Sequence, residues 1–291
     1  MQNDKNTTRS KNKPKVLITG AGGFIGSGLF SKLHYLDPLG VDINFKKEST
    51  VRNLLDVDIR DEEKAKILLN EYSPDVIFHF AALTSPQRNE DNKELAKESH
   101  ISITYNIINN ISKDAHLIFP STDKVFDGTD SCPDEDAQAN PLWAYGEFKL
   151  QCERLIKNRV RHAHILRFPI VHSLGEHTAL SIGAGPGSFI DKAILDIKSG
   201  KKISVFKNVK RCFLKLSELL EVLEKVMTDQ HYGIYHFGSR MMSYHERLLF
   251  LCKENNINCE GKLIPTTGKA LPLVQSLNTD KCNKIFNFNF S

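Results

Sequence analysis

Two groups of polar residues have the types and spacing that proton transfer at a carbonyl group requires. Tyr145 and Lys149 stand four residues apart in "AYGEFK", so a helix would place them on one face. A tyrosine titrates at about pH 10 unaided, and an adjacent ammonium would let the phenol exchange protons closer to neutrality. Thr122, Asp123 and Lys124 follow the apolar run "AHLIFP", which predicts a buried strand that ends at this polar cluster.

Short apolar runs alternate with longer amphipathic ones up to about residue 168. The strands are predicted at "KVLITG", "DVIFHFAA", "AHLIFP" and "AHILRF", and the helices over residues 24–36, 94–111 and 142–156. This rhythm indicates an α/β fold with a doubly wound parallel sheet of the Rossmann type. Asn140 and Pro141 are typical of the start of the helix that carries Tyr145. Ligands of such sheets bind outside the carboxyl ends of the strands, where Thr122 is expected.

The alternation of strand and helix patterns becomes less regular after about residue 168, which predicts a division of the chain into three parts. Residues 1–13 are polar and basic and are expected to form a disordered tail. Residues 14–170 form the expected dinucleotide-binding domain, and residues 171–291 a smaller substrate-binding region. Within the latter, residues 175–188 are rich in Gly and Ser and are expected to form a mobile loop.

A glycine-rich turn follows the first predicted strand and opens the first predicted helix. Gly20, Gly23 and Gly26 in "ITGAGGFIGSGLF" would allow a tight turn and a close approach of the backbone to a pyrophosphate. The helix N-terminus would then meet the negative charge of that group. The turn therefore predicts a dinucleotide site, to which Phe24 and Ile25 would also contribute.

Acidic residues further along the chain are candidates for binding the adenosine half of the cofactor. Asp42 follows the glycine turn by about twenty residues, the spacing at which a carboxylate bonds the ribose of NAD. Lys46 and Lys47 could instead bind the 2′-phosphate of NADP, so either cofactor is possible, with NAD slightly favoured. Asp58 could border the adenine pocket or be a solvated turn residue. Further cofactor contacts are expected from its neighbour Ile59 and from Ala81 and Ala82, the last two residues of the run "DVIFHFAA".

Composition argues against several other classes of protein. The net charge of +4 comes from 39 basic and 35 acidic residues spread along the chain, so no concentrated basic face for nucleic acid is expected. The six cysteines have no CxxC spacing, and the histidines no metal spacing, so we expect no metal site and free thiols in the cytoplasm. No apolar run is long enough to cross a membrane.

These motifs, in this order, resemble the extended short-chain dehydrogenase/reductase family. That family combines a TGxxGxxG loop, a Ser or Thr after the central strand, and a YxxxK pair. The chain is most similar to its dTDP-4-dehydrorhamnose reductase group, whose pattern of Ser-Thr-Asp, one intervening residue and Val-Phe-Asp-Gly is met by residues 121–128. The resemblance extends from about Lys15 to Asn283.

Three positions depart from that group. Lys124 stands where the reductases usually carry Tyr, His100 where Asn is usual, and Ala270 where an Arg often precedes the Pro. An Asp-Lys pair after Ser-Thr is instead similar to that of inverting nucleotide-sugar 4,6-dehydratases, although their spacing to the Tyr is much shorter.

The resemblance implies an NAD(P)-dependent reductase of a nucleotide-diphosphate 4-keto-6-deoxy sugar. Tyr145 would protonate the oxygen that receives the hydride, and Lys149 would hold the ribose and lower the pKa of the phenol. Thr122 would polarise the carbonyl, while Asp123 and Lys124 would face the sugar. Two alternatives remain open: a 4,6-dehydratase or epimerase with tightly bound NAD(P), and a non-catalytic regulatory subunit of the same fold. A homodimer is a further expectation.

Overall fold

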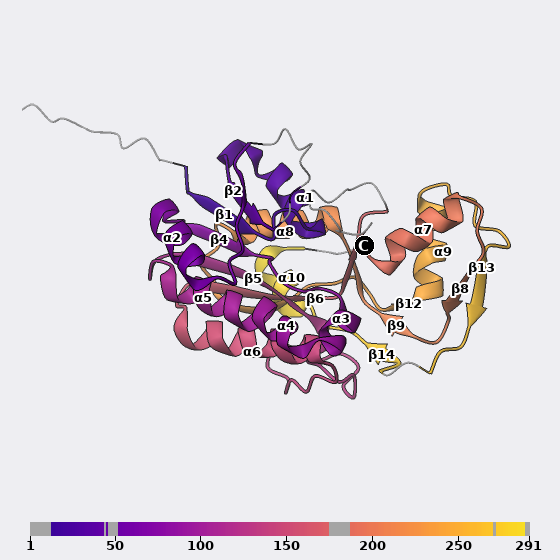
Figure 1. Cartoon of the computed structure of the whole chain (residues 1–291). Coiled ribbons are helices and arrows are strands. Elements are labelled where there is room, and N and C mark those ends of the chain that lie inside the picture. Colours follow the sequence, from indigo (N-terminus) through magenta and orange to yellow (C-terminus); the bar gives the residue numbers. More distant parts are fainter. Residues whose placement is uncertain (1–12, 44, 46–51, 175–186, 270–271, 289–291) are drawn as a thin grey trace, which may run out of the picture.

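A seven-stranded sheet forms the centre of the molecule (Figure 1). The computed structural model describes residues 13–43, 45, 52–174, 187–269 and 272–288. All neighbouring strands are parallel, in the order β11-β6-β5-β4-β1-β2-β3. They are β1 (Val16–Thr19), β2 (Leu39–Asp42), β3 (Leu54–Asp56), β4 (Val76–His79), β5 (His116–Thr122), β6 (Ala163–Phe168) and β11 (Gly233–His236). The predicted Rossmann-type sheet is confirmed.

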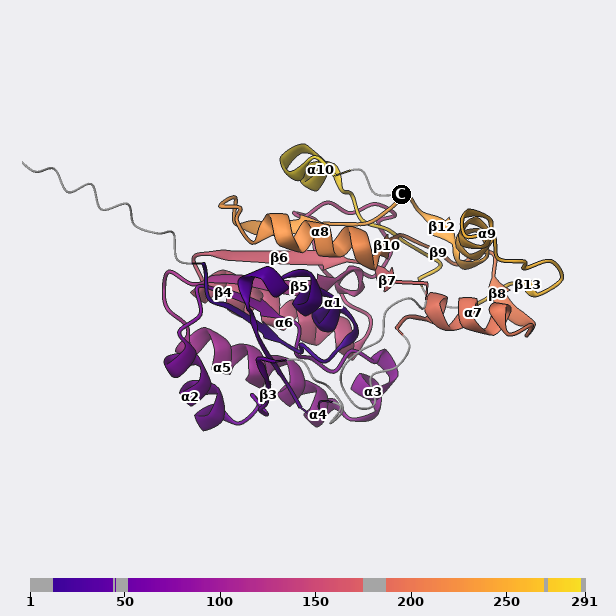
Figure 2. The same cartoon turned by 90° about the horizontal axis from the view of Figure 1, so that it is seen from above.

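Helices cover both faces of this sheet (Figure 2). One face packs against α1 (Phe24–Lys32), α8 (Leu216–Val226) and α10 (Asp280–Phe286), the other against α2 (Glu62–Tyr72), α5 (Ile103–Asn110) and α6 (Ala144–Arg159). Successive strand residues point to opposite faces, so Ile118 belongs to the first core and Leu117 to the second. Shorter helical segments complete this part: η1 (His34–Leu36), α3 (Pro86–Asp91), α4 (Lys93–Lys97), η2 (Glu98–Ser102) and η3 (Asp123–Val125).

A smaller lobe lies beside the sheet and has its own core. The lobe contains α7 (Phe189–Lys198) and α9 (Tyr244–Glu254), the strand pair β8 (Ile203–Phe206) and β13 (Leu263–Thr266), and a sheet of β12 (Met242–Ser243), β9 (Lys210–Arg211) and β14 (Val274–Gln275). Its core includes Ile194, Leu248 and Leu251. Strands β7 (Ile170–His172) and β10 (Phe213–Lys215) pair with each other.

The predicted boundary at residue 170 divides the sequence, but several segments after it pack on the large sheet. Strand β11 and helices α8 and α10 come from the last third of the chain and pack on the large sheet. Strand β11 pairs along β6, which would otherwise expose unpaired backbone groups at the sheet edge. The predicted tail (1–13) and loop (175–188) lie outside the described residues except at Lys13, Gly187 and Ser188.

Helix α6 begins later than the sequence predicts. Its first residue is Ala144 and its N-cap is Trp143, which provides no side-chain hydrogen bond. The Ala144 N–H instead donates to the Glu90 carboxylate, at 2.6 Å. The predicted cap at Asn140 is wrong, because that amide donates to Asp127 at 2.8 Å.

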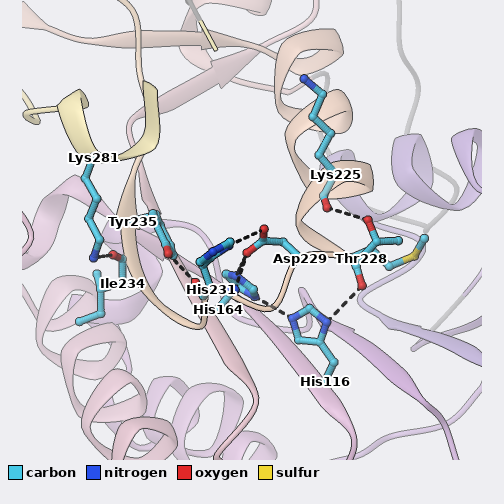
Figure 3. Close-up of polar contacts among 10 residues, drawn as sticks. His116, His164, Lys225, Thr228, Asp229, His231, Ile234, Tyr235 and Lys281 are labelled. Atoms are coloured by element: carbon cyan, nitrogen blue, oxygen red, sulfur yellow. Dashed lines mark hydrogen bonds and ion pairs between the residues drawn. The ribbon is translucent and has the colours of Figure 1, made fainter. Parts of the chain in front are cut away.

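A buried histidine pair, His116 and His164, lies at the amino ends of β5 and β6 (Figure 3). Thr122 is the last residue of β5, at the other end of that strand. His116 Nε2 and His164 Nδ1 are 2.7 Å apart, and His116 Nδ1 lies 3.2 Å from the Met227 carbonyl oxygen. Because a carbonyl only accepts, we assign the His116 proton to Nδ1, and His164 then donates to His116. Burial lowers the pKa of His116 to about 4. Through the Met227 carbonyl the pair ties both strands to the segment before β11, and the 3.3 Å contact of His164 Nε2 with Asp229 is an ion pair only when that nitrogen is protonated as well.

A buried ion pair holds strand β6 to helix α6. Arg167 of β6 and Glu153 of α6 are both nearly inaccessible, and their closest atoms are 2.7 Å apart. Ser121 donates a short hydrogen bond to the same carboxylate. This network fixes α6, and with it the residues that precede Glu153 on the helix, relative to β5.

We expect Glu153→Leu to lower the free energy of unfolding by about 3–5 kcal/mol, because it leaves the buried Arg167 guanidinium without its counter-charge. Chemical denaturation measures the change. Glu147→Leu, at an exposed position of the same helix, is the matched control and should change stability by about 0.5 kcal/mol or less. Equal stability of the two variants would contradict the role given to the ion pair.

Candidate functional site

The strand order reverses between β1 and β4, and this is where such sheets form their ligand crevice. Gly20 follows β1 with φ +70°, and a Cβ there would lie 2.6 Å from the Ala81 nitrogen. A Cβ at Gly26 would lie 2.1 Å from the Gly20 carbonyl oxygen. The fold itself therefore requires glycine at both positions.

Gly23 differs from these two glycines. A Cβ at Gly23 would meet the Gly20 carbonyl oxygen at 3.2 Å, a contact that a small shift relieves. Gly23 is also the N-cap of α1 and has no side chain to cap the first turn. Its position suits the close approach of a phosphate to the helix N-terminus, where Phe24 and Ile25 form the first turn.

Asp42 links the glycine turn to β2. Its carboxylate accepts hydrogen bonds from the Gly22 N–H at 2.9 Å and the Ile43 N–H at 2.7 Å. The carboxylate thus lies beside the turn, as a ribose-binding residue should, and its role stays a prediction. Lys46 and Lys47, the candidates for binding a 2′-phosphate, lie outside the described residues.

The other predicted cofactor contacts border the same edge of the sheet. Arg60 pairs with Asp58 at 2.6 Å and holds the pKa of that carboxyl below its usual range. The neighbouring Ile59 is buried in the core against α5, and Ala81 donates its N–H to the Thr19 hydroxyl at 3.2 Å. Ala82 is half-buried. Their contacts with an adenine ring or nicotinamide stay predictions.

Lys149 reaches the carboxyl end of β5, of which Thr122 is the last residue. The alternation of β5 turns Ser121 toward Glu153, and Thr122 toward the opposite face. The Lys149 ammonium donates to the Pro120 carbonyl at 2.8 Å and lies 4.6 Å above the Phe119 ring. Burial lowers the pKa of Lys149 to about 8.

Tyr145 lies one helical turn before Lys149 and is half-buried. The described residues offer its hydroxyl no hydrogen-bond partner. Burial, and secondarily the charge of Asp123, raise the pKa of Tyr145 above its ordinary value. This direction is opposite to the lowering expected from Lys149, because the ammonium is bound to a strand carbonyl and desolvation dominates at the phenol. The phenol therefore holds its proton.

Asp123 and Lys124 form the short segment η3 directly after Thr122. The Thr122 hydroxyl and Asp123 Oδ1 are 3.1 Å apart, and the Lys124 ammonium lies 3.8 Å from Asp123 Oδ2. Asp123 is almost completely buried, and Oδ2 has no hydrogen-bond donor. The first turn of α6 packs on this segment, since a Cβ at Gly146 would lie 2.1 Å from the Lys124 carbonyl oxygen.

His100 lies within η2, a π-helical turn between α4 and α5. Its ring contacts the edge of Tyr145 at 5.7 Å between centroids, and Nε2 lies 3.1 Å from the Leu83 carbonyl oxygen. Burial and the charge of Lys149 lower the pKa of His100 to about 3, so the ring is neutral. A π turn inserted into a helix often marks a functional site.

Three residues of the smaller lobe, Arg211, Tyr244 and Gln275, also reach this region. The Gln275 side chain of β14 accepts a hydrogen bond from the Lys124 ammonium at 2.9 Å. The charges of Arg211 and Asp123 act on the pKa of Tyr244, whose overall direction is upward because of burial. Gln275 and Tyr244 lie in no recognisable motif, so only the folded chain brings them here. The Arg211 guanidinium is buried and donates to the Pro272 carbonyl at 2.7 Å.

A pocket of about 780 Å³ lies elsewhere, and its lining does not include Thr122, Tyr145 or Lys149. It is bordered by the loop from Gly238 to Met242 and by residues 276–280. We place the chemistry at the crevice because the polar groups converge there.

No helix in the described ranges is long and apolar enough to cross a membrane. The described residues also contain no cluster of three His, Cys, Asp or Glu side chains that could hold a metal ion.

Comparison with known proteins finds one family model and several relatives that match most of this chain. The model of the RmlD substrate binding domain matches residues 14–274. Methionine adenosyltransferase 2 subunit beta of Xenopus tropicalis is 30% identical over 93% of this chain and 82% of its own length. The spore coat polysaccharide biosynthesis protein SpsK of Bacillus subtilis is 25% identical over 84% of this chain and 80% of its own.

Two solved structures show the same fold. A dTDP-4-dehydrorhamnose reductase of Bacillus anthracis in complex with NADP has a TM-score of 0.79 and 21% identity, over 96% of this chain and 95% of the other. The enzyme WbmH of Bordetella bronchiseptica in complex with NAD+ has a TM-score of 0.75 and 19% identity, over 96% and 94%. At these identities the similarity establishes the fold.

We expect Gly23→Val to abolish NAD(P)H binding while the protein stays folded, because the branched side chain occupies the space that a pyrophosphate needs. Nicotinamide fluorescence measures binding, and thermal unfolding measures folding. Gly26→Ala is the contrasting variant, since its methyl group collides with the backbone, and it should lose stability. Wild-type affinity in Gly23→Val would mean that the glycine serves only the turn.

Proposed function

The chain belongs to the RmlD substrate binding domain family, and from this premise we propose that it is an NAD(P)-dependent reductase of a nucleotide-diphosphate 4-keto-6-deoxy sugar. One observation carries the proposal. Thr122 is the last residue of β5, Lys149 donates to the Pro120 carbonyl of that strand, and Tyr145 lies one helical turn before Lys149, at the same edge of the sheet as the glycine turn after β1.

The residues at the crevice fit a dinucleotide. Gly23 leaves room at the start of α1, and Asp42 lies beside the turn at the end of β2. A bound NAD(P)H would supply the hydride that reduces a carbonyl carbon. Lys149 would hold the ribose of the nicotinamide half by exchanging its hydrogen bond to the Pro120 carbonyl, or by adding a second one.

Tyr145 would act as the proton donor of the reaction. A carbonyl oxygen that receives a hydride on its carbon gains negative charge and needs a proton. The raised pKa of Tyr145 keeps the phenol protonated, which is the state that a donor must have before reaction. The Thr122 hydroxyl, at the end of β5, would polarise the same oxygen.

The substrate's diphosphate would bind on the side of the smaller lobe. The Arg211 guanidinium is buried without a carboxylate partner in the described part of the chain, and its Nε–H has no acceptor. Buried charges are normally paired, so an anionic group of a ligand would satisfy this cation. We therefore assign Arg211 to a phosphate of the nucleotide.

The relative from Xenopus supports a second candidate function. Its name is that of a subunit, which favours a regulatory role in methionine adenosyltransferase for this chain too. Size-exclusion chromatography with a catalytic methionine adenosyltransferase subunit would test for a complex. Turnover of a keto sugar nucleotide by the isolated chain would favour the reductase. The homodimer, the cytoplasmic location and the lack of nucleic-acid binding stay predictions.

We expect Tyr145→Phe to lower turnover at least about a hundredfold, because the change removes the proton donor, and to leave cofactor affinity nearly intact. Steady-state oxidation of NAD(P)H with a dTDP-4-keto-6-deoxy sugar measures turnover, and fluorescence titration measures affinity. Tyr105→Phe, the same loss of one oxygen at an exposed tyrosine of α5, is the matched control and should leave turnover unchanged. Unimpaired turnover in Tyr145→Phe would remove this residue from the mechanism.

Lys124→Met separates the reductase from a dehydratase. A reductase needs only the tyrosine to supply a proton, so we expect hydride transfer within about tenfold of the wild type. A dehydratase also moves protons at neighbouring carbon and oxygen atoms, so the same change would stop the reaction after oxidation of the sugar. A single-turnover experiment that follows nicotinamide absorbance, with and without added NAD(P)H, decides. Reduced cofactor that accumulates without product would favour the dehydratase.

A further inference from the structure

The side chain of Gln275 joins the smaller lobe to the end of β5. Its Nε2 donates to the carbonyl oxygens of Asp123 at 2.8 Å and Phe126 at 3.0 Å, and its Oε1 accepts from the Lys124 ammonium at 2.9 Å. Two carbonyls require the donor end of the amide and an ammonium requires the acceptor end, so only one orientation satisfies all three contacts. Gln275 is 1% exposed, which leaves the amide no alternative partner in solvent.

The Lys124 ammonium is consequently held between two groups. One is Gln275 Oε1, and the other is Asp123 Oδ2 at 3.8 Å, which is an ion-pair distance but too long for a hydrogen bond. The ammonium carries three donors, and about a quarter of the side chain remains exposed. Asp123 Oδ2 is buried and has no donor of its own. The pair therefore offers a ligand the remaining donors of the ammonium and one carboxylate acceptor.

A hydroxyl group matches this pair better than a charged group does. Its oxygen can accept from the Lys124 ammonium while its proton goes to Asp123 Oδ2, which would complete the hydrogen bonding of a buried carboxylate. A carboxylate would be repelled by Asp123, and an amine by Lys124. Asp123 also acts on the pKa of Tyr145, so the bound hydroxyl would lie near the reacting carbonyl.

We propose that Gln275 is a positioning residue: it holds the Lys124 ammonium beside Asp123 Oδ2, so that the two side chains facing the sugar bind one of its hydroxyl groups. The inference rests on the proposed function for its substrate class. It adds a determinant of sugar specificity that comes from the smaller lobe.

Isothermal titration can test this without turnover. The probes are the glucose nucleotides of uridine, deoxythymidine, guanosine and cytidine diphosphate, each compared with the free diphosphate. We expect Lys124→Met and Gln275→Met each to weaken the best-bound glucose nucleotide about tenfold, the size of one lost contact to a charged group, and to leave the free diphosphate unchanged. Gln87→Met, at an exposed glutamine, should change neither.

The double variant distinguishes positioning from a general structural role. If Gln275 acts through Lys124, adding Gln275→Met to Lys124→Met should have no further effect, because the ammonium to be held is gone. Any of three results would overturn the inference: additive losses of affinity in the double variant, equal losses for the free diphosphate, or a wild type that binds the sugar nucleotide no better than the diphosphate. If Gln275→Met does not fold, Lys124→Arg is used instead. Preference of Lys124→Arg for the glucose nucleotide over the diphosphate supports the site, and loss of that preference refutes it.

The outcome is separable from that of the proposed function. If the chain binds glucose nucleotides in this manner but never oxidises NAD(P)H with a keto sugar, the hydroxyl-site inference stands and the reductase proposal fails. If the chain reduces a keto sugar but Lys124→Met binds glucose nucleotides as tightly as the wild type, the reductase proposal stands and the hydroxyl-site inference fails.

Discussion

The alternation of side chains along β5 is the constraint on which the candidate site depends. Neighbouring residues of a strand must point to opposite faces, so Ser121 and Thr122 cannot serve the same purpose. Ser121 is directed to Glu153 in the ion pair with Arg167, and this fixes helix α6 on that face. Thr122 is thereby directed to the crevice, and Lys149 of the same helix reaches the Pro120 carbonyl. A shift of one residue in the register of β5 would exchange the structural and the candidate functional hydroxyl.

The sequence predicted β1, β4, β5 and β6 of the large sheet because each is a short, buried apolar run. The four buried runs and the glycine turn are short-range patterns, and they correctly indicated where Gly20, Thr122 and Tyr145 lie in the fold. The start of α6 was misplaced because a tertiary contact from Glu90 replaced the local cap at Asn140. A local pattern cannot anticipate a partner more than fifty residues away.

The electrostatics and the long-range partners were the least predictable. The spacing of Tyr145 and Lys149 suggested a lowered phenol pKa, whereas burial raises it and a strand carbonyl binds the ammonium. Desolvation depends on everything packed around a group, which no motif encodes. Gln275 reaches Asp123 across 152 positions from a two-residue strand, too short to leave a pattern in the sequence.

The origin of β11 in the last third of the chain has a consequence for synthesis. Strand β6 is complete at Phe168, but its free edge is covered only by residues 233–236, and α10 reaches the sheet still later. A nascent chain between these points would present the unpaired backbone groups of β6 to any other extended segment nearby. Products truncated before residue 233 should therefore associate with one another, whereas loss of the last few residues should not have this effect.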